Sequence, residues 1–67
     1  MAVARVTQVI ASSEESWDAA VDEAMRRASS TLRNITGIEV KRQQAKVEKG
    51  KIVEYRVTVD IIFILDD

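Results

Sequence analysis

The last strand-forming segment of the chain ends in five consecutive apolar residues, Ile61 to Leu65. Before this run the segment alternates, with apolar residues at odd-numbered positions from Tyr55 and polar residues at even-numbered positions up to Asp60. Ile62 and Ile64 make the second face apolar as well, and a strand with two apolar faces is usually buried on both sides. One long helix covers one face only, so we expect Ile62 and Ile64 to contact another copy of the chain.

Size and composition favour the same conclusion. A chain of 67 residues predicts one small domain, residues 1–67, and a domain of this size is only marginally stable alone. The sequence has no cysteine and no histidine, which excludes disulfides, thiolate metal sites and the commonest general base. Oligomerisation is the remaining common way to stabilise such a domain.

The charge balance excludes several partners. Ten basic and eleven acidic residues give a net charge of −1, whereas nucleic-acid binders concentrate positive charge. No segment approaches the roughly 20 apolar residues of a membrane span, and the first residues lack the pattern of a secretory signal. We therefore expect a cytoplasmic protein with no nucleic-acid or membrane partner.

The first half of the chain predicts a strand followed by a helix. The strand covers residues 3–10. Ser12 and Glu15 have capping-box spacing and Ser13 is a rival cap, so the helix is expected to begin there and to continue to about residue 33. Asn34 and Gly37 suit the exit from a helix.

The second half predicts a β-hairpin, with strands over residues 38–48 and 52–65. The apolar positions change phase between Val40 and Ala45, which predicts a bulge or bend, and Gly50 suits the turn. The expected fold class is α+β with the order β-α-β-β, in which the helix packs on one face of a three-stranded sheet.

The sequence offers little chemistry. Without histidine or cysteine, proton transfer would rest on carboxylates, lysines or Tyr55, and no carboxylate pair has an informative spacing. Trp17 and Tyr55 are typical of core or subunit-contact residues. Asp66 and Asp67 are expected to keep an apolar end soluble. We therefore do not expect an enzyme.

Two long runs, SSEESWDAAVDEAMRRASSTLRNITGIEV and VEYRVTVDIIFILDD, resemble the dodecin family. The likeness rests on Ser12–Glu15, Gly37–Val40 and the spacing from Tyr55 to Phe63. It implies a three-stranded antiparallel sheet curled around one long helix, and a homo-dodecamer in the form of a hollow shell. It also implies flavin (FMN or riboflavin), bound in stacked pairs near two-fold contacts and stored rather than turned over.

The positions that match the family's flavin pocket are Gly37, Gln44, Arg56 and Ile64, and their residue types depart from the family pattern. Gly37 replaces the tryptophan that stacks on the flavin ring, and Arg56 replaces a ring-edge glutamine. Gln44 and Ile64 each replace an arginine. The loss of an aromatic platform removes roughly 1–3 kcal/mol of stacking per ring, so the usual stacked flavin pair is not expected.

The pattern is similar to a second branch of dodecin-like proteins, which lack the flavin tryptophan and for some of which calcium has been proposed. Glu15 matches a position near the three-fold axes of the shell. Carboxylates from three copies could there gather around calcium or magnesium, both of which prefer oxygen ligands. The alternative interpretation of Glu15 is the capping box.

Three functions stay open at this stage. The first is a non-enzymatic shell that binds or stores a small ligand or ion without the usual flavin pair. The second is a flavin-storing dodecin with a remodelled pocket, and the third is an oligomeric interaction module with no ligand.

Overall fold

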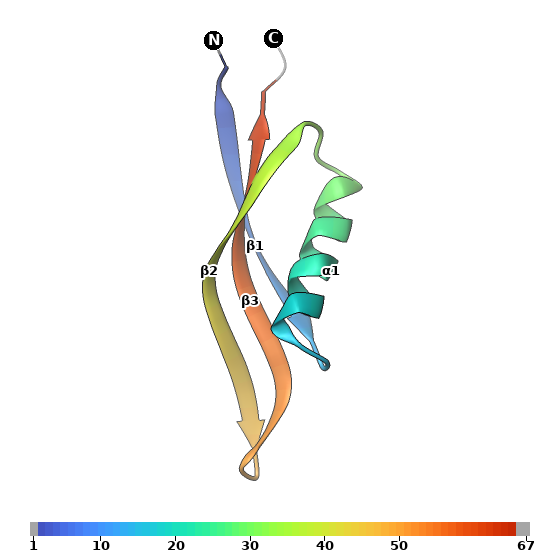
Figure 1. Ribbon diagram of the computed structural model, residues 1–67, viewed down its shortest axis with the longest axis vertical. Helices are drawn as coiled ribbons and strands as arrows, with labels where there is room; N and C mark the ends of the chain where they lie inside the picture. The colour runs from blue at the N-terminus through green and yellow to red at the C-terminus, as the bar shows by residue number, and fades with distance from the viewer. Residues whose placement is uncertain (1, 66–67) are drawn as a thin grey trace.

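The computed structural model describes residues 2–65, so the expectation for Asp66 and Asp67 lies outside the described residues. The elements are β1 (Ala4–Ser13), α1 (Trp17–Ser29), β2 (Ile35–Glu48) and β3 (Lys51–Ile64). They form one antiparallel sheet in the order β1-β3-β2, with α1 on one face (Figure 1). The predicted β-α-β-β fold is confirmed, and the strand that carries the apolar run is the central one.

The core is a contact between small helix residues and branched strand residues. Ala20, Ala24 and Ala28 are the buried positions of α1. They face Val57, Val59 and Ile61, whose exposed fraction is 0%. Methyl groups let the helix axis approach the sheet closely, while β-branched residues fill a pleated surface well. The helix packs over β1 and β3.

The helix begins later than the sequence predicted. Ser12 and Ser13 are the last residues of β1 and pair with Arg56 and Tyr55 of β3. Ser16 is the N-cap, and its Oγ accepts a hydrogen bond of 3.0 Å from the Ala19 N–H. The predicted Ser12–Glu15 capping box is therefore wrong. Ser12 and Ser13 pair with the long central strand β3, and this pairing outweighs their preference for capping a helix. Ser16 is an equally good cap and takes that position.

The helix also ends earlier than predicted, at Ser29 instead of about residue 33. The N–H groups of Thr31 and Leu32 both bond to the Ala28 carbonyl, which tightens and closes the last turn. Asn34 then takes a positive φ of 62° and leads into β2, as a residue leaving a helix would. Gly37 does not serve this exit, because it lies inside β2.

The hairpin strands show the predicted irregularity. The β2–β3 register shifts between Val40 and Arg42, which confirms an irregularity in the expected interval. Two further shifts lie between Ile35 and Gly37 and between Lys46 and Val47. Lys49 and Gly50 form the two-residue turn with φ values of 53° and 76°, as a tight hairpin requires.

The strand boundaries extend beyond several of the predicted ones. β1 continues three residues past the expected end at residue 10, and β2 begins three residues before residue 38. β2 is an edge strand whose exposed side chains form ion pairs along the strand, Glu39 with Lys41 at 3.7 Å and Glu48 with Lys46 at 3.6 Å.

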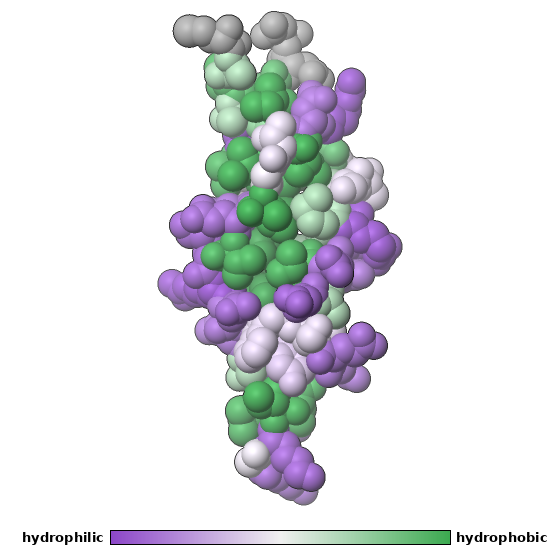
Figure 2. Space-filling model, in the orientation of Figure 1, coloured by the Kyte–Doolittle hydropathy of each residue, from purple (hydrophilic) through white to green (hydrophobic). Residues whose placement is uncertain are grey.

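The helix leaves part of its own side of the sheet uncovered. Val40 of β2 lies opposite the fully buried Val59, yet 44% of it is exposed. In the same direction of view as Figure 1, Figure 2 shows hydrophobic side chains in a band down this side of the molecule, between hydrophilic groups. One short helix is too narrow to cover three strands.

Candidate functional site

The four predicted pocket positions lie on one face of the sheet, turned away from α1, which we call the open face. Arg56 and Ile64 alternate with the buried residues of β3 and so point to this face. Gln44 pairs directly with Arg56, and Gly37 pairs with Ile62. Residues directly opposite in an antiparallel pair share a face, so all four positions belong to the open face.

One end of the open face is apolar. Ile62 and Ile64 of β3 are half-buried, flanked by Val6 and Ala4 of β1. Val6 is 54% exposed in the single chain. On the other side Ile62 covers Gly37, and its Cδ1 lies 3.4 Å from where a Cβ on the glycine would be. A Cβ at this position would make ordinary van der Waals contact with Ile62, and the glycine itself presents no platform.

The other end of the open face is polar and hollowed. Gln44, Lys46 and Arg56 line a shallow pocket of about 360 Å³ together with Ala45. Arg56 Nη2 lies 3.1 Å from Glu54 Oε1. This hydrogen bond, followed by one from Ser12, holds the pKa of the Glu54 carboxyl below its ordinary value of 4.5. The pocket thus has two cationic side chains, and each of them already has an ion-pair partner on its own strand, Arg56 with Glu54 and Lys46 with Glu48.

The two ends do not form a single pocket within one chain. Arg56 and Ile64 are eight residues apart on β3, which corresponds to about 27 Å of extended strand. The middle is spanned by a hydrogen bond of 2.9 Å from Gln8 Nε2 to Asp60 Oδ1. One small ligand cannot contact both ends in the same chain.

The aromatic residues lie on the opposite side. Trp17 Nε1 donates to the Gln44 carbonyl at 2.9 Å, and its ring meets Tyr55 edge-on with centroids 4.8 Å apart. Phe63 alternates in phase with the buried Ile61 and therefore points to the helix side. The sequence has one tryptophan, one tyrosine and one phenylalanine. The open face of residues 2–65 accordingly has no ring on which a flavin could stack.

Glu15 lies in the exposed connection between β1 and α1. Its backbone N–H donates to Ser13 Oγ at 2.9 Å, and because Ser16 is the cap, its carboxylate has no capping role. Within the part of the chain that the structure describes, no three acidic residues come together as a metal site. A cation at Glu15 would need carboxylates from several copies.

Sequence reasoning missed the contribution of β1 to the open face. Ile10 is 66% exposed and, like Val6, points away from the helix. The available signal was the spacing of Val6 and Ile10, which places both on one face of the strand. No helix of residues 2–65 has the length and apolarity needed to cross a membrane.

The fold and its open face define a class of small β-α-β-β proteins in which a helix covers one side of the sheet and leaves the other side exposed. The chain belongs to the dodecin family: the family model described as Dodecin matches residues 3–66. The family resemblance predicted from the sequence is confirmed.

Individual relatives support the same family assignment. Dodecin from Thermus thermophilus is 31% identical over 65 residues, which cover 97% of this chain and 94% of that protein. The structure of dodecin from Streptomyces coelicolor matches with a TM-score of 0.92 and 33% identity, covering 98% of this chain and 94% of that one. A calcium dodecin from Mycobacterium tuberculosis, a calcium-chelating immunodominant antigen with a novel calcium-binding site, matches with a TM-score of 0.81 and 32% identity over 96% and 91% of the two chains.

The lowered pKa of Glu54 predicts a pH-dependent stability. A carboxyl whose pKa is lower in the folded state stabilises the fold above its unfolded pKa, and this contribution is lost as pH falls through the folded pKa. Arg56→Gln is therefore expected to raise the pKa of Glu54 toward 4.5 and to shift the acid-unfolding midpoint to higher pH. NMR titration of the Glu54 side chain measures the first effect. Arg42→Gln, on the same face, is the control, and an equal shift in that variant would contradict the assignment.

Proposed function

We propose that the chain is a non-enzymatic binding protein of the dodecin type. Twelve copies form a hollow shell that holds a small ligand or ion at contacts between subunits, without the usual stacked flavin pair. The observation that carries this proposal is the open face, which joins an exposed apolar end to a polar pocket and has no aromatic ring.

The apolar end supports assembly. Val6 is more than half exposed, and the neighbouring Ile62 and Ile64 are only half-buried in the single chain. Contiguous apolar surface of this kind marks a contact with another protein. A second copy is the favoured partner, because a domain of 67 residues without disulfides needs further burial to be stable. Copies that meet on this face also bring together pocket positions that one chain holds far apart.

A charge introduced into the apolar end of the open face should prevent formation of the twelve-subunit particle. Ile62→Asp or Ile64→Asp would place an unpaired carboxylate in a buried contact, which is costly. We expect small species in place of a twelve-subunit particle, as measured by light scattering after size-exclusion chromatography.

Ile62→Val is the matched control. It removes one methylene at a cost of about 0.5–1.5 kcal/mol and should leave the particle intact. A full-size particle formed by both aspartate variants would show that these side chains are not at a contact.

The chemical groups of the open face indicate the class of ligand. Gly37 and Ile62 provide an aliphatic surface, and Arg56 and Lys46 provide positive charge. A flavin-storing protein with a remodelled pocket is the alternative, in which Arg56 meets a phosphate or the ring edge and another aromatic side chain stacks. An interaction module with no ligand is the third function, supported only by the apolar surface.

Flavin binding distinguishes the first two functions. We expect the purified protein to be colourless and to leave the fluorescence of added riboflavin unquenched. Gly37→Trp restores an aromatic platform and should tighten riboflavin binding about ten-fold or more, given roughly 1–3 kcal/mol per stacked ring. Gly37→Leu controls for added bulk. Strong quenching by the unmodified protein would establish the flavin-storing alternative.

Calcium is the second candidate ligand, favoured by the free carboxylate of Glu15 and by the relative described as a calcium dodecin. Calcium should bind to the assembled particle, measured by calorimetry, and binding should weaken in Glu15→Gln. The neighbouring Glu14→Gln is the matched control. Equal calcium binding by the Glu15 variant would exclude this site.

The absence of histidine and cysteine supports a protein without catalysis. Arg26 lowers the pKa of Glu23, and Arg56 lowers that of Glu54, which moves both carboxyl groups away from the neutral range of a general base. The net charge of −1 supports the absence of a nucleic-acid partner. A cytoplasmic location remains a prediction.

A further inference from the structure

We propose that a groove between α1 and the free edge of β1 binds an aliphatic monocarboxylate, with Arg27 as the group that receives the carboxylate. The groove has a volume of about 630 Å³. It lies outside the pocket positions of the open face, so this inference goes beyond the proposed function. We call it the α1–β1 groove.

The floor of the groove is apolar. Val9 and Ala11 of β1 line it from one side, and Ala24 and Ala28 of α1 from the other, with Leu32 at one end. The helix contributes only methyl groups here, which leaves space that longer side chains would fill. Small-molecule sites typically have volumes of about 300–1,000 Å³, and half of the residues that line this groove are apolar.

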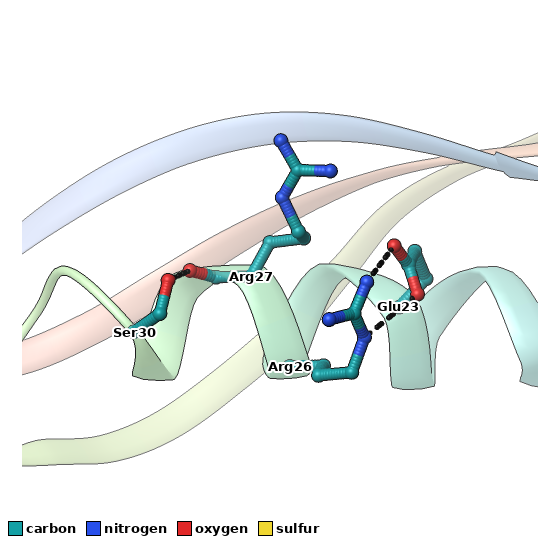
Figure 3. Close-up of polar contacts among 4 residues, drawn as sticks. All are labelled: Glu23, Arg26, Arg27 and Ser30. Atoms are coloured by element: carbon teal, nitrogen blue, oxygen red, sulfur yellow. Dashed lines mark hydrogen bonds and ion pairs between the residues drawn. The ribbon is translucent and has the colours of Figure 1, made fainter.

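The positive charge at the mouth of the groove is not neutralised by direct contact, although Glu23 attracts Arg27 at longer range. Glu23 and Arg27 are the two charged residues of the lining. Glu23 is held by Arg26, whose Nη2 and Nε donate to its two carboxylate oxygens at 2.6 Å and 3.1 Å. Figure 3 shows Arg27 reaching from the helix toward β1, with no contact drawn to its guanidinium. Among residues 2–65 this guanidinium has no hydrogen-bond or ion-pair partner.

The backbone acceptors near the mouth are already satisfied. The Arg27 carbonyl accepts from Ser30 Oγ at 2.7 Å and from the Ser30 N–H at 3.3 Å. The Ala28 carbonyl accepts from the N–H groups of Thr31 and Leu32. These bonds reduce the negative character of the helix end that an incoming anion would otherwise meet. Thr7 lies in the lining with its hydroxyl unbonded within residues 2–65 and supplies a second donor.

The shape and charge together select the ligand class. From Glu23 to Ser30 the groove follows α1 for about 10 Å, which suits an extended alkyl chain. One free guanidinium matches one carboxylate, and the pair forms a charge-assisted hydrogen bond. A neutral alcohol of the same length lacks this bond, and a dianion carries a second charge for which the groove has no partner. An alkyl monocarboxylate is therefore the best match.

Decanoate is the probe that tests the proposal. Calorimetric titration of the assembled full chain, below the concentration at which decanoate forms micelles, should show saturable binding. Arg27→Gln should weaken that binding about ten-fold or more and leave the weaker binding of decanol unchanged. Arg5→Gln, an arginine of β1 outside the groove, is the matched control and should bind decanoate normally.

Two further variants sharpen the assignment. Arg26→Gln should also weaken decanoate binding although Arg26 is outside the groove, because Glu23 is then free to pair with Arg27. Arg56→Gln should have no effect, since its pocket is separate. The outcome of the decanoate experiment is therefore independent of the outcomes of the flavin and calcium experiments.

Three outcomes would overturn the proposal. The first is no binding of decanoate by the unmodified protein, and the second is equal binding by Arg27→Gln and the unmodified chain. The third is a crystal structure of the assembly in which a neighbouring copy fills the α1–β1 groove.

Discussion

The structure depends on the contact between the alanines of α1 and the branched residues of β3. Ala20 and Ala24 hold the helix against Val57 and Val59, and all four are almost completely buried. Because this contact uses one side of the central strand, it gives the sheet two unequal faces. The covered face stabilises the single chain, whereas the open face has only neighbouring strands to shield it. The fold of the single chain thus depends on one face of β3, and the other face is available for the association proposed above.

The difference between the covered and the open face of β3 also explains which parts of the fold could be predicted from the sequence. Alternation along β3 identified the buried face, and the apolar pair Ile62 and Ile64 identified the second face, because strand periodicity is set by backbone geometry alone. The irregularity after Val40 followed from a change of phase. The start of α1 was missed because Ser12, Ser13 and Ser16 are equally good caps, and only pairing of β1 with β3 selects among them. That pairing is a long-range effect that local sequence does not encode.

The four candidate positions share one face of the sheet, but their arrangement on it could not be predicted. Matching to the family placed Gly37, Gln44, Arg56 and Ile64, and the structure brings all of them to the open face. Their separation along the strand could not be judged without the β2 register, which three irregularities shift. The ion pair between Arg56 and Glu54 could have been predicted from the sequence, because residues two apart in a strand lie on the same face. The free guanidinium of Arg27 could not be predicted from the sequence, because Arg26 and Arg27 are adjacent and either could pair with Glu23. The structure shows that Glu23 pairs with Arg26.

The ion pairs along β2 have a consequence for a chain that has an exposed apolar face. An unpaired strand edge is a template for adding further strands, and long sheets built in this manner lead to fibrils. Lys41 and Lys46, each beside a glutamate, line that edge with alternating charge. A strand from another molecule that docks there would have to desolvate these groups. The chain can therefore expose apolar surface on its open face while resisting the addition of further strands at the β2 edge.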